Sequence, residues 1–364
     1  MIHFSKERWA RVKENNRLWR ERKLGRPLVQ WTLDGYATDI PCPATPANGK
    51  GSTSFDRAYS IDQIVDRWAY DLSRKRFLGD AFPCFWVDFG PGIVADFVGG
   101  KAVPKDGTVW FYPGKFEGMD IHDVHIEYSE NSPWLERIIE IGRASVDRFE
   151  GMVQVGVTDL GGAVDIVASL RGTENLLYDC VDDPEEVERL VWEVHDVWHR
   201  YYKLITDNLK GNPGYTSWPD VFGVEPNYML QCDFSYMLGP AMFDRFVAPE
   251  LRATCKKLSG GCFYHQDGIG ELPHTKTLHT MEGLAGVQWQ PGDGDHPPSI
   301  LWFDQQRRIR DDGKLSQTWG SPEELKSLIN AIGDVSNTVV MGWGNASDEE
   351  RFVSALKKLG IDPE

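Results

Sequence analysis

The sequence lacks paired cysteines and long apolar runs. Its six cysteines are scattered without any Cys-x-x-Cys spacing, so neither a disulfide framework nor a zinc knuckle is expected. No apolar stretch approaches the roughly 18 residues that a membrane-spanning helix requires, and the charged N-terminal segment has no signal-like apolar core. We therefore expect a cytoplasmic protein with reduced thiols and no membrane association.

The sequence is also poor in basic residues relative to acidic ones. The net charge is −16, so there is no basic surface to neutralise phosphates, and nucleic-acid binding is not expected. A GxGxxG loop is missing after the first expected strand, which disfavours a dinucleotide-binding domain. A globular protein that binds a small-molecule substrate is favoured instead, with a homodimer as the assembly to test.

Strands and helices alternate along most of the chain. From residue 151 onward their connections are short, which predicts a parallel sheet with right-handed crossovers. With about eight strands we predict a single α/β domain, a (β/α)8 TIM barrel, over residues 1–364. The expected strands are 27–33, 82–88, 151–157, 215–218, 228–232, 261–265, 285–289, 315–319 and 338–342.

Two additions to the barrel are expected before residue 151. Residues 1–26 contain a polar helix with a sparse apolar stripe, which we expect to form an outer lid. Residues from about 105 to 130 predict an accessory β-hairpin whose arms are 108–112 and 123–128.

The candidate catalytic residues come from the carboxyl ends of the expected strands, where barrel enzymes place their chemistry. His265 and Asp267 are two residues apart and therefore lie on the same side of a strand. They could bind one divalent ion, or the carboxylate could fix the histidine tautomer for acid–base work. Asp233 and Tyr236, which follow the preceding strand, are expected to be catalytic partners. The structural alternatives are a hydrogen-bonded rim histidine and a turn-capping aspartate.

Other strand ends carry the candidate substrate-binding residues. Most of the fourteen tryptophans should fill the core, but those at strand ends could stack on a sugar, a ring or a quaternary amine. An aspartate beside a Gly-Gly turn can equally be a cap. Two histidines, His274 and His279, are placed on a surface-like helix without a role. The substrate-binding candidates are Asp88, Asp159, Trp218, Gln288, Trp289 and Trp343.

Four segments carry a family likeness. They are DPEEV at 183–187, GPAMFDRFVAPEL at 239–251, YHQDG at 264–268 and VQWQPG at 287–292. Together they resemble the uroporphyrinogen decarboxylase superfamily, which includes porphyrinogen decarboxylases and corrinoid-linked methyltransferases. The resemblance covers residues 150–360 well and the N-terminal part loosely, and it implies a (β/α)8 barrel.

Departures from the family pattern shape the expected function. The decarboxylases carry arginines after the first strand to hold porphyrinogen carboxylates, whereas WTLDGY at 31–36 contains none. The zinc methyltransferases use His-x-Cys and a further cysteine near the last strand, where this chain has His265-Gln266-Asp267 and Gly342-Trp343-Gly344. An aspartate in place of a thiolate makes a harder, weaker site for zinc. The resemblance implies the methyltransferase-like branch, with zinc or another divalent metal at His265 and Asp267.

Three hypotheses follow for the function. The first is an enzyme that moves a methyl group between a small substrate and a corrinoid protein or another acceptor; no Asp-x-His-x-x-Gly motif is present, so a partner protein would supply the corrinoid. The second is a decarboxylase or lyase acting on a small, weakly charged substrate, with Asp233, Asp267 or Asp88 handling a proton. The third is a non-catalytic binding barrel, which predicts ligand binding that survives His265→Ala.

Overall fold

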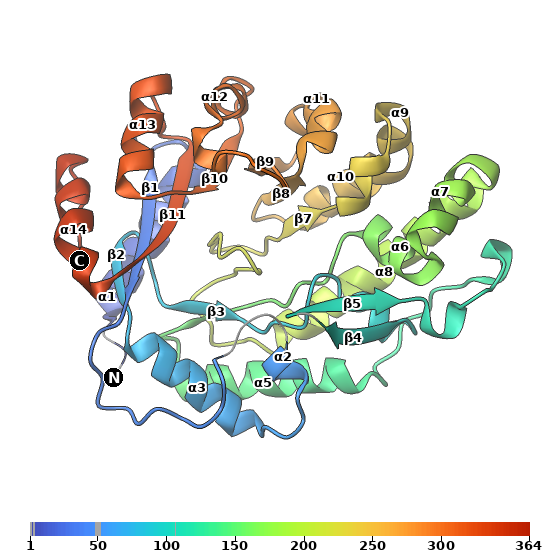
Figure 1. Cartoon of the computed structure of the whole chain (residues 1–364), viewed down its shortest axis with the longest axis horizontal. Coiled ribbons are helices and arrows are strands. Elements are labelled where there is room, and N and C mark those ends of the chain that lie inside the picture. Colours follow the sequence, from blue (N-terminus) through green and yellow to red (C-terminus); the bar gives the residue numbers. More distant parts are fainter. Residues whose placement is uncertain (1, 3, 48–51, 106) are drawn as a thin grey trace.

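A seven-stranded sheet forms the centre of the computed structural model, which describes residues 2, 4–47, 52–105 and 107–364 (Figure 1). The strand order is β2-β1-β11-β10-β9-β8-β7, and every neighbouring pair is parallel except β1 and β2. The strands are β1 (Leu28–Asp34), β2 (Arg76–Gly79), β7 (Met229–Gln231), β8 (Cys262–Asp267), β9 (Leu284–Gln290), β10 (Leu315–Trp319) and β11 (Thr338–Asn345).

Two smaller sheets complete the strand inventory of the described residues. Strands β3 (Cys84–Trp86) and β6 (Gln154–Gly156) pair in parallel, and β4 (Lys101–Lys105) and β5 (Thr108–Tyr112) form an antiparallel hairpin. Within the described part of the chain, the strands do not close into one hydrogen-bonded sheet, because the large sheet ends at β2 and β7. The fold is therefore mixed α/β with a mostly parallel central sheet.

The strand expected at 215–218 is a loop. It contains only an isolated antiparallel bridge between Tyr215 and Gly223. Pro219 has no backbone N–H, and Asp220 adopts φ 55°, so this stretch cannot continue a ladder. The loop nevertheless reaches β6, since Val157 N donates to Thr216 O at 3.0 Å.

The helices lie on both sides of the strands, with α12 and α13 above and α3 and α5 below in Figure 1. Local signals explain several boundaries: Ser60 and Ser321 form capping boxes, and Pro184 begins the longest helix. The helices are α1 (Lys6–Arg20), α2 (Ser52–Phe55), α3 (Ile61–Ser73), α4 (Val94–Phe97), α5 (Pro133–Phe149), α6 (Ala163–Arg171), α7 (Thr173–Asp182), α8 (Pro184–Asp207), α9 (Pro240–Met242), α10 (Ala248–Lys257), α11 (Thr275–His279), α12 (Phe303–Asp311), α13 (Pro322–Ile332) and α14 (Glu349–Lys358).

Helix α1 is not the expected outer lid. Its Trp19 belongs to a buried cluster with residues at the starts of strands. These include Leu28 and Leu315, the first residues of β1 and β10, and Val339, the second residue of β11. Arg20 donates to Gly260 O at 2.9 Å and to the carbonyls of Gly261 and Phe222. The helix therefore covers the amino ends of the strands, and its sparse apolar stripe is a buried surface.

The accessory hairpin also differs from expectation. The arm at 108–112 pairs with β4 at 101–105 and not with 123–128. Residues 124–128 form no strand; Val124 and Ile126 are buried, and Ile126 N donates to Glu193 Oε2 at 2.8 Å. A side chain of α8 thus satisfies the backbone group that a second arm would have paired.

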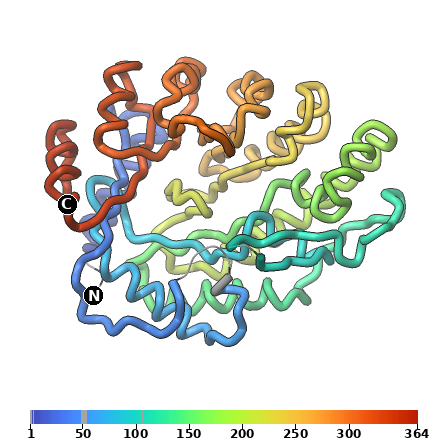
Figure 2. Tube along the Cα trace, viewed as in Figure 1, coloured from blue at the N-terminus to red at the C-terminus, as the bar shows by residue number. Residues whose placement is uncertain are grey.

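The two chain ends lie on the same side of the molecule (Figure 2). Arg11 of α1 forms an ion pair with Asp362 at 2.6 Å, and Gly79 N donates to Pro363 O at 3.0 Å. Among the described residues, no helix is long and apolar enough to cross a membrane.

Candidate active site

A row of polar side chains crosses four strands of the large sheet. Gln231, His265, Gln288 and Gln317 are register neighbours on β7, β8, β9 and β10. Residues an odd number of positions away along a strand, such as Cys262 three residues before His265, point to the opposite face. The sheet therefore presents amides and one imidazole together on one face, where all three glutamines are buried.

His265 is oriented by this row. Its Nδ1 hydrogen-bonds to Gln288 Oε1, which assigns the proton to Nδ1 because an amide oxygen can only accept. Its Nε2 then carries a lone pair and lies 3.9 Å from Asp267 Oδ2. Trp218 packs edge-on against the imidazole, with 5.0 Å between ring centroids. The side chain is fixed in one tautomer with its basic nitrogen facing the carboxylate.

Three expected catalytic residues come together in the structure. Asp233, His265 and Asp267 each offer one donor atom, and the three atoms lie within 4.8 Å of one another. Burial raises the pKa of Asp267, as does the charge of Asp233, while the charge that His265 carries when it is protonated opposes the rise. Two carboxylates held this close favour a shared cation, which would relieve their repulsion.

The short 3-10 turn Asp233–Met237 positions Asp233. Asp165 at the start of α6 accepts hydrogen bonds from Asp233 N at 3.1 Å and from Phe234 N at 2.8 Å. Burial and the charge of Asp233 both raise the pKa of Asp165. Its role as a turn cap for Asp233 was not evident in the sequence, because the two residues are far apart in the chain.

Two histidines expected at the surface are buried. His274 donates from Nε2 to Ser235 O at 3.0 Å and stacks on Phe243, which anchors the turn that carries Asp233. His279 contacts Asp312 Oδ2 through Nδ1 at 2.6 Å. The helix expected to carry these two histidines begins as a 3-10 segment because Pro273 interrupts the α-helical ladder.

Tyr236 lies at the rim of the site. Its side chain is 52% exposed, and its ring packs so closely on Gly268 and Gly270 that a Cβ on either would lie 2.7–2.8 Å from it. Gly268 also has φ 90°, which other residues rarely adopt. The glycines after β8 thus let Tyr236 lie against the segment that follows Asp267.

Asp159 is buried beside the polar row. Gly161 N donates to its Oδ1 at 2.9 Å, and Gln231 Nε2 lies 3.4 Å from the same atom. Burial raises the pKa of Asp159 to about 8. It is therefore both the cap of the Gly-Gly turn and a carboxyl group that holds a proton at neutral pH. Asp88 accepts from Gly90 N at 2.9 Å, which closes a local turn.

The expected tryptophan walls divide into two groups. Trp218 contacts His265, and its indole nitrogen is buried without a hydrogen-bond partner in the described part of the chain. Trp343 is 68% exposed and stacks on Trp319 at 6.5 Å. Trp289 is not a wall: it is fully buried on the helix-facing side of β9 and packs against Trp302 at 5.3 Å. Strand alternation requires this, because the adjacent Gln288 faces the site.

A cleft of about 550 Å³ reaches one of the three donors, Asp233, and its volume suits a small-molecule ligand. Gln231 and Asp233 line it on one side, and Trp110 and Tyr112 of β5 line it on the other. The hairpin therefore forms a wall of the cleft.

Comparison with known proteins shows a likeness of fold. No family model matches the chain, and no curated protein matches it in sequence. Among solved structures, a methyltransferase from Methanosarcina mazei is similar, with a TM-score of 0.56 and 9% sequence identity. The alignment covers 89% of this chain and 95% of that chain, so the shared architecture extends over nearly the whole of both.

Proposed function

We propose that this chain is a methyltransferase-like enzyme whose residues Asp233, His265 and Asp267 hold a divalent cation at the end of a substrate cleft. The convergence of these three donors within 4.8 Å carries the proposal. Two sources support the reaction class: the fold shared with the Methanosarcina mazei methyltransferase and the family segments in the sequence.

The proposal includes a single (β/α)8 barrel of the uroporphyrinogen decarboxylase type. Eight mutually parallel strands would form its wall: β1, β3 and β6 to β11. β2 pairs with β1 and precedes β3 in the chain, and the loop through Thr216 bonds to the end of β6 and, through Ser217, to the start of β7. These insertions would explain why the wall lacks a continuous hydrogen-bond ladder. The donors would then lie at the carboxyl ends of the strands.

The donor set fits a divalent cation. One imidazole nitrogen and two carboxylate oxygens suit zinc, manganese or iron, and three protein ligands leave a position for substrate. No thiol belongs to this set, since Cys262 is buried on the opposite face of β8. When bound, the cation would supply Lewis acidity toward a substrate donor atom. The chain's own contributions are to fix Nε2 of His265 as a donor and to hold Asp233 in place through Asp165.

A corrinoid protein as methyl donor or acceptor is the finer part of the proposal. The cleft beside Asp233 has exposed aromatic residues, Trp110 and Tyr112, at its edge, where a partner could contact the substrate. The cytoplasmic location and the homodimer stay predictions from the sequence.

One observation favours a decarboxylase or lyase as the second candidate. Asp159 holds its proton up to a pKa of about 8 and lies beside Gln231, which lines the cleft. A buried neutral carboxyl group is suited to deliver a proton to a substrate carbanion. This reading predicts product formation that survives chelation and is lost in Asp159→Asn.

Elemental analysis of the purified protein tests the metal proposal. We expect about one equivalent of a divalent metal in the wild type, and loss of that metal in both His265→Ala and Asp267→Ala. Asp304→Ala is the matched control, because the Asp304 side chain is 98% exposed and belongs to a surface ion pair. A metal-free wild type, or metal retained in both site variants, would contradict the proposal.

A further inference from the structure

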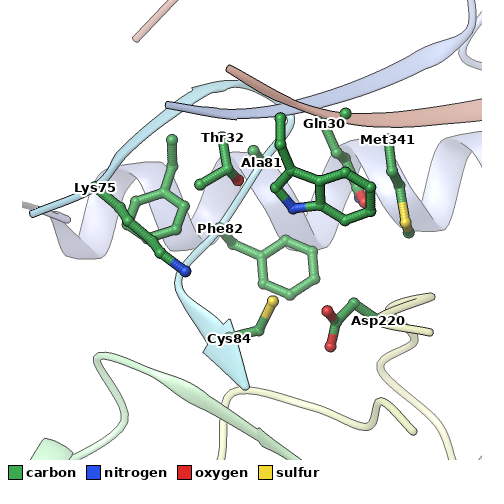
Figure 3. A pocket seen from close by; sticks show the side chains of 11 residues that line it. Gln30, Thr32, Lys75, Ala81, Phe82, Cys84, Asp220 and Met341 are labelled. Atoms are coloured by element: carbon green, nitrogen blue, oxygen red, sulfur yellow. The ribbon is translucent and has the colours of Figure 1, made fainter. Parts of the chain in front are cut away.

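A second cavity, of about 110 Å³, is lined by residues of β1, β2, β3 and β11 (Figure 3). Its lining includes Lys75, Cys84 and Asp220, with Phe82 and Trp343 as aromatic walls. We propose that this cavity binds a small zwitterion, an amino acid or its N-methylated derivative, with the ammonium group at Asp220 and the carboxylate at Lys75. The proposal does not depend on the metal or on methyl transfer.

Asp220 supplies the anionic end of the cavity. Its Oδ1 is buried without a hydrogen-bond partner in the described part of the chain. An unpaired buried carboxylate oxygen is costly, and a ligand ammonium would satisfy it. The backbone at Asp220 has φ 55°, a conformation that an aspartate adopts at some cost and that aims its carboxyl group toward Cys84 in Figure 3.

Lys75 supplies the cationic end. Across the described residues, no carboxylate lies within the 4.0 Å ion-pair distance of its ammonium group, which points into the cavity in Figure 3. Burial raises the pKa of Asp220 to about 7 and also raises the pKa of Cys84, and the charge of Lys75 opposes both rises, so Lys75 lies within electrostatic reach of both groups. The two opposite charges face one space but do not pair, which is the arrangement that a ligand carrying both charges would complete.

The aromatic walls favour methyl groups on the ammonium. Phe82 and Trp343 line the cavity, and aromatic side chains attract cations and pack against methyl groups. The volume limits the ligand to a few heavy atoms beyond the charged groups. Because Trp343 is 68% exposed, the ligand can enter past this side chain.

Isothermal titration calorimetry with N,N-dimethylglycine tests the proposal. Its isostere 3-methylbutanoate keeps the carboxylate without the ammonium, and 2-(dimethylamino)ethanol keeps the ammonium without the carboxylate. We expect N,N-dimethylglycine, or a free amino acid from a panel measured alongside it, to bind at least about tenfold more tightly than either comparator. Equal binding of a comparator, or no zwitterion binding at millimolar concentration, would overturn the proposal.

Variants locate the binding site. Asp220→Asn retains a residue that tolerates the positive φ, and Lys75→Met retains the length of the side chain, so both should fold. Each should weaken zwitterion binding about tenfold or more, whereas Lys203→Met, which alters an exposed side chain on α8, should not. Mass spectrometry of Cys84 alkylation gives a second reading, because bound ligand should protect this thiol in the wild type. Unchanged affinity in both cavity variants, or unprotected Cys84 at saturation, would place the ligand elsewhere and refute the proposal.

Discussion

At the scale of single residues, the proposed metal-binding side chains are positioned by hydrogen bonds with neighbouring residues. His265 contributes its lone pair because Gln288 occupies Nδ1, and Asp233 is held because Asp165 accepts two backbone bonds from its turn. Gln288 is buried, and its Nε2 has no hydrogen-bond partner in the described part of the chain. Burying this unpaired amide nitrogen lowers the stability of the folded protein. The amide is explained if it orients the histidine.

Replacing Gln288 by leucine should weaken metal binding without unfolding the protein. The imidazole would lose the acceptor that fixes its tautomer, and loss of such a contact lowers metal affinity by about 10- to 100-fold. A competition titration with a fluorescent zinc chelator measures the change. Gln288→Glu retains the acceptor and should retain most of the affinity; equal losses in both variants would argue against an orienting role.

Asp159 should make the stability depend on pH. Its pKa is raised from 3.8 to about 8 in the folded protein, so between these values the folded state holds a proton that the unfolded state releases. Stability is therefore greatest below pH 4 with respect to this group, and it is lost as pH rises to about 8, with a slope of at most about 1.4 kcal/mol per pH unit.

Urea unfolding of Asp159→Asn and wild type at pH 5, 7 and 9 checks this expectation. The variant should gain stability relative to the wild type between pH 5 and pH 7, and the difference should level off above pH 8. A difference that does not vary with pH would mean that Asp159 ionises normally.

The proximity of the three proposed donors could be predicted in part from the sequence. His265, Asp267 and Asp233 could be predicted because strand alternation and strand ends determine where their side chains point. Asp165 and Asp220 could not, because one caps a turn distant in the chain and the other depends on a positive φ in a loop. The sequence does contain one signal for Asp220: Pro219 and Asp220 are both typical of turns, which indicates a loop here and not the end of a strand.

At the scale of elements, turns and insertions decide the shape of the site. The expected strands β7 to β11 are present, because each is a short, mostly buried segment between a helix and a turn. The hairpin partner of β5 and the loop at 215–218 were mispredicted, since apolar runs such as 123–128 can be buried without pairing. β2 was not expected, and it creates the edge beside the second cavity.

The glycine turn after β8 tests whether turns determine the shape of the site. Gly268→Ala would combine a residue at φ 90° with a Cβ 2.8 Å from Tyr236, so we expect about 1–3 kcal/mol of destabilisation and displacement of Tyr236. Gly239→Ala is the matched control, because that glycine has φ −72° and nothing lies within 4 Å of its added Cβ. Thermal unfolding of the two variants compares them; similar melting temperatures would contradict the expectation.

At the scale of the whole molecule, helix α1 ties distant parts of the chain together. Arg20 bonds to carbonyls near β8 and to Phe222, and Arg11 pairs with Asp362 near the C-terminus. The buried surface of Trp19 joins the amino ends of several strands. We therefore predict that the chain unfolds as one domain and that α1 belongs to it.

Deletion of residues 1–26 tests this prediction. The truncated chain should lose cooperative folding, because the carbonyls that Arg20 satisfies would be unpaired and Phe263 would lose Trp19, on which it stacks. Near-ultraviolet circular dichroism and ANS binding report the loss. A truncated protein with the same sharp unfolding transition would show that α1 is an independent addition.

The position of α1 also has a kinetic consequence. Because the helix covers the amino ends of the strands, we expect small molecules to enter and leave the cleft beside Asp233 through a single mouth. A product would then have to depart before the next substrate could enter. Inhibition by product should accordingly be competitive with the substrate that occupies the cleft.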